Sequence, residues 1–68
     1  MKINWQNGDV LYEGNYLVTV MRQITGETFV STDHYEFCDG WTNYGEGTPY
    51  KVMAFYPISE IEPYINPV

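Results

Sequence analysis

Four short runs of apolar and β-branched residues follow one another along the chain, and turn-forming residues separate them. The clearest run is residues 16–21, Tyr-Leu-Val-Thr-Val-Met, because aromatic and β-branched side chains favour extended backbone. Turn signals precede this run at Asn7-Gly8-Asp9 and Glu13-Gly14-Asn15, and Thr25-Gly26 follows it. The pattern predicts a strand over 16–21 that enters a hairpin.

The second run, residues 28–38, alternates as expected of a strand whose two faces differ. One face carries Phe29, Ser31, Asp33, Tyr35 and Phe37, and the other carries Val30, Thr32, His34 and Glu36. Asp39-Gly40 is a turn signal, so we expect a short third strand over residues 41–44.

The last run, residues 50–56, predicts a fourth strand in front of a proline-rich end. Regular alternation would place Tyr50, Val52, Ala54 and Tyr56 on one side and Lys51, Met53 and Phe55 on the other. Three prolines from Pro57 onward exclude a regular strand or a long helix, and one helical turn is expected over 59–62 with Ser59 as its N-cap. The sequence therefore predicts one mainly β domain over residues 1–68, an antiparallel meander of three to four strands.

The core of so short a chain must depend on its rings. A chain of 68 residues buries only roughly 60% of its unfolded surface, and Cys38, the single cysteine, excludes an internal disulfide or a thiolate zinc cluster. We expect these aromatic side chains in the core: Trp5, Tyr16, Phe29, Phe37 and Phe55. Tyr44, which lies beside Gly45 in a loop, is expected to be exposed.

The net charge of −6 narrows the possible partners. It repels nucleic acid and anionic lipid, so direct nucleic-acid binding is not expected, and no apolar run is long enough to cross a membrane. The N-terminus has no apolar stretch typical of a signal peptide, and a lone cysteine suits a reducing compartment, so we expect the cytoplasm of a bacterial host.

Short motifs along the chain carry a family resemblance. They are Trp5, Gly14-Asn15-Tyr16-Leu17-Val18, Tyr35, Gly40-Trp41 and Val52-Met53-Ala54-Phe55-Tyr56-Pro57-Ile58. This arrangement resembles the domain of unknown function 551 family, whose small members are common in phages and prophages. The closing segment departs from the family, because Phe55-Tyr56 stand in place of a Trp and Ser59 in place of a second Pro. The resemblance implies a small β-rich protein of phage type and transfers no catalytic residue.

Residues with catalytic or metal-binding chemistry have simpler interpretations here. His34 is expected to be a surface residue paired with Glu36, its neighbour on the same face, rather than a general base. Cys38 lies in an acidic segment, which disfavours a thiolate nucleophile. The loop with Asp39, Asn43 and Glu46 does not match an EF-hand. We therefore expect no enzyme, no metal and no cofactor.

The carboxylates are concentrated in one segment. Residues 23–48 carry five Asp and Glu side chains and no Lys or Arg, a local net −5. One interpretation is a patch that meets a basic protein surface, and the other is that the charge only maintains solubility. The residues predicted to form the patch are Asp33, Glu36, Asp39 and Glu46, with Trp41 and Tyr44 as aromatic anchors.

The favoured hypothesis is an inhibitor that occupies a basic surface of a host nucleic-acid-binding defence protein, such as a CRISPR effector. One alternative is an assembly module that forms a homodimer through an exposed edge strand. Another is a carbohydrate-binding module built on exposed rings.

Overall fold

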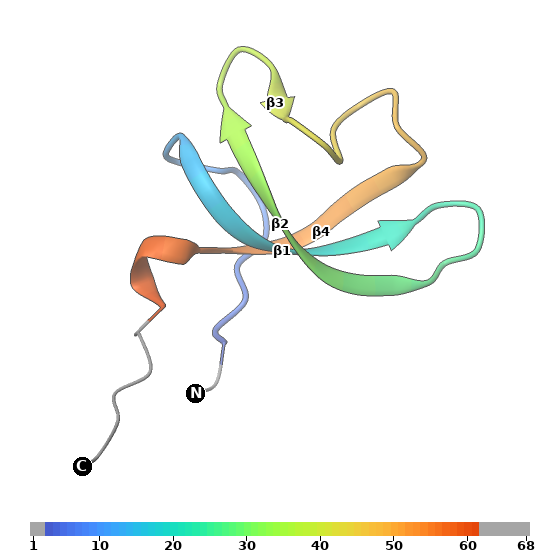
Figure 1. The fold of residues 1–68 in the computed structure, drawn as a ribbon, viewed down its shortest axis with the longest axis horizontal. Helices are drawn as coiled ribbons and strands as arrows, with labels where there is room; N and C mark the ends of the chain where they lie inside the picture. Colours follow the sequence, from blue (N-terminus) through green and yellow to red (C-terminus); the bar gives the residue numbers. More distant parts are fainter. Residues whose placement is uncertain (1–2, 62–68) are drawn as a thin grey trace.

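The computed structural model of the chain describes residues 3–61, and these form a curled, half-barrel sheet of antiparallel strands (Figure 1). Its elements are β1 (Gly14–Arg22), β2 (Thr28–Glu36), β3 (Gly40–Trp41), β4 (Tyr50–Pro57) and a 3-10 turn, η1 (Ile58–Glu60). The strand order is β3-β2-β1-β4. The predicted mainly β fold with one short helical turn near the C-terminus is confirmed.

Strand β1 is the centre of the sheet, with β2 on one side and β4 on the other. Its alternate residues Tyr16, Val18 and Val20 are buried, because β1 has a neighbour on both edges and turns this face toward the concave side. The β1–β2 hairpin closes where Gly26 adopts a φ of 76°, a left-handed conformation in which glycine avoids the clash of a Cβ.

The connection between β3 and β4 makes the sheet differ from a simple meander. Strand β4 does not pair with β3 but joins β1 at the opposite edge of the sheet, so residues 42–49 must cross from one edge to the other. In Figure 1 this connection closes the open side of the half-barrel. The third strand, expected over 41–44, ends at Trp41 because the amides of Asn43 and Tyr44 donate to Asp33 instead of to a ladder.

A bulge in β4 corrects the predicted faces of that strand. Thr19 pairs with Ala54 while Val20 pairs with Val52, so Met53 is an extra residue without a partner in β1. The side-chain alternation shifts by one position there. Phe55 is therefore buried on the same side as Val52, whereas regular alternation had placed the two on opposite faces.

The aromatic core differs in composition from the one predicted from the sequence. Tyr16 and Phe55 are buried as expected, and their rings pack edge to face with 5.6 Å between the ring centroids. The expectation for three other rings was wrong: Trp5 and Phe29 are each 37% exposed and Phe37 is 58% exposed. Half-buried rings pack on the core in their place, namely Tyr35, Trp41, Tyr44 and Tyr50.

Local geometry explains the remaining differences at the strand ends. Strand β2 ends at Glu36 rather than Cys38, since the Phe37 amide donates to Glu13 Oε2 at 3.0 Å and the chain turns over residues 37–39. The helical turn begins at Ile58 with Pro57 as its N-cap residue, so Ser59 lies inside the turn and the predicted N-cap at Ser59 was wrong. Glu62 of the expected turn lies outside the described residues.

Candidate binding site

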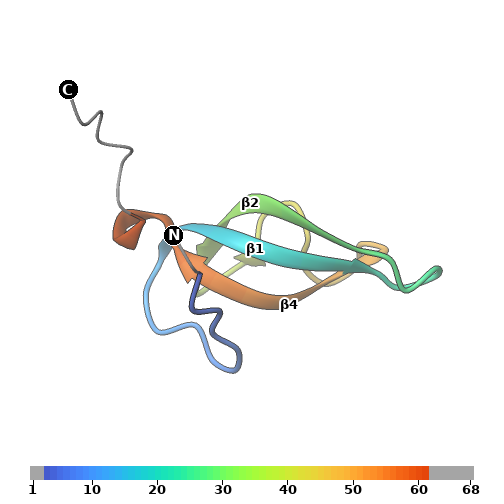
Figure 2. The same ribbon diagram turned by 90° about the horizontal axis from the view of Figure 1, so that it is seen from below.

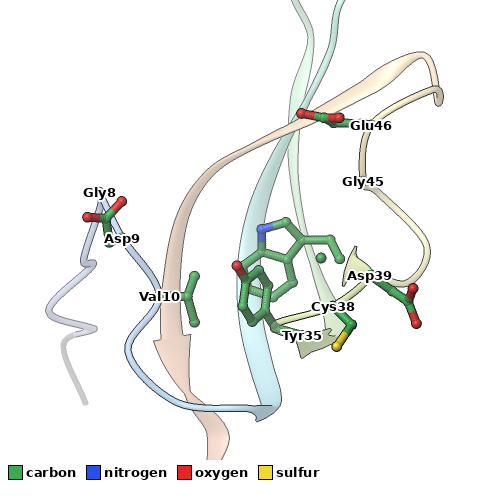
Figure 3. Close-up of a pocket in the computed structure, with 10 residues that line it drawn as sticks. Gly8, Asp9, Val10, Tyr35, Cys38, Asp39, Gly45 and Glu46 are labelled. Carbon is green, nitrogen blue, oxygen red and sulfur yellow. The ribbon is translucent and has the colours of Figure 1, made fainter.

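A cleft of about 500 Å³ opens beside the core, where the N-terminal segment meets two parts of the chain around β3 (Figure 3). One wall is the N-terminal segment, the second is the β2–β3 turn, and the third is the connection that crosses to β4. The lining residues are Gly8, Asp9, Val10, Tyr35, Cys38, Asp39, Gly40, Trp41, Gly45 and Glu46.

Two aromatic rings on neighbouring strands contribute to this cleft. Tyr35 and Trp41 are directly paired residues of β2 and β3, and their ring centroids lie 4.9 Å apart at an interplanar angle of 66°. Trp41 also packs edge to face on the ring of the buried Tyr16, with 5.5 Å between the two ring centroids. Because both rings are half-buried against the core, they form a firmly held aromatic surface for any group that enters.

Three carboxylates line the cleft, one from each wall. Asp9, Asp39 and Glu46 are exposed, and none makes a hydrogen bond or ion pair with another described residue. Figure 3 shows them spaced around the ring of Tyr35 rather than in contact with one another. No Lys or Arg among residues 3–61 lines the cleft, and the three carboxylates give it a negative electrostatic potential that favours a cation.

The N-terminal wall is attached to the outer edge of β4. The amide of Gln6 donates to the carbonyl of Phe55 at 2.9 Å, and the amide of Phe55 donates back to the carbonyl of Gln6 at 2.9 Å. Three residues later the chain reaches Asp9. Figure 2 shows this N-terminal segment on the β4 side of the sheet.

The third wall is fixed by Asp33, whose predicted place on the partner surface was wrong. Asp33 is only 4% exposed, and its carboxylate accepts the backbone amides of His34, Asn43 and Tyr44 at 2.8–3.1 Å. It also accepts the side-chain amide of Asn43 at 3.0 Å. Inward alternation along β2 buries this charge, and the bonds anchor the start of the connection that carries Glu46.

The other predicted site residues divide between the cleft and its surroundings. Trp41, Asp39 and Glu46 lie in the cleft together. Glu36 does not, because it is on the outer face of β2 with Oε1 3.4 Å from His34 Nε2. Tyr44 was expected to be exposed but is half-buried, and its hydroxyl lies 3.0 Å from Ser31 Oγ.

His34 has a structural role on that outer face. Its Nδ1 lies 2.9 Å from Asn15 Oδ1, and its Nε2 faces the carboxylate of Glu36. The predicted pairing of a surface histidine with Glu36 is confirmed. Among residues 3–61, no group of three or more histidine, cysteine or acidic side chains is arranged to hold a metal ion.

Sequence reasoning missed the contributions of Asp9 and Tyr35. Asp9 was interpreted only as part of a turn, and no local pattern indicates that residue 9 lines the same cleft as residue 39. The inward position of Tyr35 was available from the alternation of β2. Cys38 is exposed at the rim of the cleft.

Comparison with known proteins adds no relative: no family model, curated protein or solved structure matches the chain. The resemblance to the domain of unknown function 551 family therefore stays a prediction. Within residues 3–61, the structure contains no helix with the length and apolar character needed to cross a membrane.

Proposed function

We propose that this protein binds a basic protein surface and that the cleft receives a Lys or Arg side chain from it. The observation that carries the proposal is the placement of three carboxylates, Asp9, Asp39 and Glu46, around two firmly held aromatic rings. None of the three has a hydrogen-bond or ion-pair partner in the part of the chain that the structure describes. A cation over an aromatic face gains about 0.5–1 kcal/mol when exposed and about 2 kcal/mol when desolvated. Surrounding carboxylates add charge complementarity to that attraction.

Arginine suits this site better than lysine. A guanidinium group is planar, stacks on aromatic faces and is more weakly hydrated than an ammonium group, so it loses less hydration on entering the cleft. The chain contains the same contact elsewhere, since the guanidinium carbon of Arg22 lies 5.7 Å from the centre of the Tyr50 ring. The cleft volume of about 500 Å³ suits one or two side chains rather than a folded element.

The more specific form of the proposal is an inhibitor of phage type in a bacterial cytoplasm. It would occupy a basic groove of a host nucleic-acid-binding defence protein, such as a CRISPR effector. The net charge of −6 and the local −5 over residues 23–48 support it, because such charge attracts a surface that normally holds phosphates. This proposal assigns no catalytic residue, metal or cofactor.

Titration of an arginine-rich peptide by calorimetry tests the cleft. The double variant Asp39→Asn/Glu46→Gln removes two cleft charges, and we expect it to weaken binding about tenfold, ~1.4 kcal/mol for two charge contacts. The matched control is Glu36→Gln/Glu60→Gln, which removes two negative charges that lie outside the cleft and so has the same net charge. It should change the affinity for the peptide far less. Equal losses in both double variants would show that only overall charge matters.

The inhibitor hypothesis needs its own experiment. A purified CRISPR effector is mixed with the wild-type protein or with Asp39→Asn/Glu46→Gln, and its binding to target DNA is followed by electrophoretic mobility. We expect the wild-type protein to reduce DNA binding and the variant to do so less. DNA binding that is unaffected by the wild-type protein at excess would count against this target.

A further inference from the structure

Half of strand β2 has an unpaired outer edge. Strand β3 covers β2 only at Tyr35 and Glu36, and Thr42 adds one bond from its amide to the carbonyl of His34 at 3.0 Å. Along residues 28–32, no other strand of the described chain lies on that side. Figure 1 shows this half of β2 as the outermost ribbon beside β1.

The direction of the backbone groups along this edge follows from two hydrogen bonds. The carbonyl of Glu27 accepts the amide of Arg22 and so points toward β1, whereas the carbonyl of His34 points away from β1. Backbone groups alternate in direction along an antiparallel strand. The N–H and C=O groups of Thr28, Val30 and Thr32 therefore point outward, and none of the six is hydrogen-bonded within residues 3–61.

The opposite edge of the sheet, on β4, carries features that block pairing and that this segment lacks. On β4, Met53 forms a bulge and Gln6 pairs with Phe55. At the other end of β2, the carboxylate of Asp33 caps the amide of His34. Residues 28–32, Thr-Phe-Val-Ser-Thr, contain no charge and no proline, which are the usual means of blocking an edge.

We propose that residues 28–32 of β2 pair antiparallel with the same segment of a second copy of this chain. The segment is self-complementary about Val30: Thr28 of each copy would lie opposite Thr32 of the other, and Val30 opposite Val30. All six outward groups on each copy are then used, giving six hydrogen bonds across a two-fold axis. No other antiparallel register satisfies all of them.

The surroundings of the edge fit this arrangement. The outer side of His34 is occupied by Thr42, and in this register each copy would leave the shared edge at Gly26, opposite His34, where its chain turns back toward β1. Val30, which is 60% exposed, would cover Val30 of the second copy on the convex face. Phe29, 37% exposed, would lie beside Ser31 of the second copy on the concave face.

Electrostatics makes this association weak and dependent on salt. Each chain carries −6, and the pairing brings Glu27 of one copy opposite Asp33 of the other at both ends. Added salt screens this repulsion and favours the dimer. Binding of a basic partner in the cleft has the opposite salt dependence, so the two kinds of association can be separated.

A five-residue edge buries little area, and the dimer forms at high protein concentration.

Sedimentation equilibrium of four forms of the protein tests the proposal. The wild-type mass should rise from 7.9 kDa toward twice that value as concentration and salt increase. Val30→Pro removes the outward N–H at the two-fold axis and should stay monomeric. An edge strand tolerates this proline because that N–H has no bond to any of residues 3–61. Val30→Thr keeps the N–H and the β-branch and should associate like the wild type. Glu27→Gln relieves the repulsion and should associate at lower concentration.

Hydrogen exchange provides a second measurement that does not depend on the folding of Val30→Pro. In the wild type, the amides of Thr28, Val30 and Thr32 should exchange more slowly as protein concentration rises, while other exposed amides should not change. A wild-type mass of 7.9 kDa at millimolar concentration in high salt would overturn the proposal. So would a dimer whose three edge amides stay unprotected, or equal association by a folded Val30→Pro variant.

Discussion

Replacement of Asp33 by asparagine should cost a large part of the stability of this protein. The carboxylate is 4% exposed and accepts amides from His34, Asn43 and Tyr44. Asparagine keeps one acceptor oxygen, but its NH₂ group would face the Tyr44 amide, donor against donor. One hydrogen bond to a charged acceptor is worth about 1.5–3 kcal/mol, and the bonds that remain lose their charge, so we expect a loss of ~2–3 kcal/mol.

The loss expected for Asp33→Asn is large compared with the total free energy of unfolding. A chain of 68 residues at about 0.05–0.15 kcal/mol per residue has a free energy of unfolding of roughly 3–10 kcal/mol. The melting temperature should therefore fall by about 10–20 °C, using about 4–8 °C per kcal/mol for a domain of this size.

Urea denaturation followed by tryptophan fluorescence measures the loss directly. The matched control is Asp39→Asn, which removes the same charge from an exposed side chain with no hydrogen bond to a described residue. Its effect should stay within about 0.5 kcal/mol. If Asp33→Asn also stays within that range, the bonds to residues 43 and 44 contribute nothing in solution and our account of the third wall is wrong.

Two further predictions concern the packing around the cleft. Gly45→Ala would place a Cβ against the carbonyl oxygen of Trp41, so it should cost about 1–3 kcal/mol of unfolding free energy in urea titrations; unchanged stability would show that this turn adjusts freely. Burial raises the pKa of Tyr16, so the stability this residue contributes is present below pH ~10 and is lost as pH rises through its folded pKa. Tyr16→Phe removes the hydrogen bond to the Tyr12 carbonyl, so its free energy of unfolding at pH 7 should be lower than that of the wild type by about 0.5–1.5 kcal/mol. Between pH 7 and pH 11, urea titrations should show a smaller decrease in the free energy of unfolding for this variant than for the wild type. Parallel pH profiles of the two proteins would contradict this.

The strands were predictable from the sequence because their signals are local. β-Branched and aromatic residues over 16–21 and the alternation over 28–36 depend on neighbours in the chain, and both strands formed there. The division of β2 into two faces was also predicted, with Asp33 on the same face as Phe29 and Tyr35, but Asp33 was expected on the partner surface and is buried. What the alternation could not show is that the Asp33 carboxylate would accept three amide groups from Asn43 and Tyr44, ten and eleven residues further on, and become structural.

The candidate site was less predictable because it depends on contacts between distant segments. Met53 as a bulge has no sequence signal, yet it decides on which face Phe55 lies. Asp9 belongs to a segment that is attached to the sheet where Gln6 pairs with Phe55, a contact across most of the chain, and that packs on the core through Val10. The locally concentrated charge pointed to Asp39 and Glu46, and the fold brought these two together with a third carboxylate from a segment that is neutral overall.

The pairing of Gln6 with Phe55 also gives the cleft a stability of its own. Within the described chain, residues 3–9 make no other backbone hydrogen bond to the sheet, so this wall can detach at a lower free energy than global unfolding requires. A ligand that contacted Asp9 together with the rest of the cleft, as proposed above, would bind only the attached state. Occupancy of the cleft and attachment of the N-terminal segment would then be thermodynamically linked, and each would stabilise the other by the same free energy.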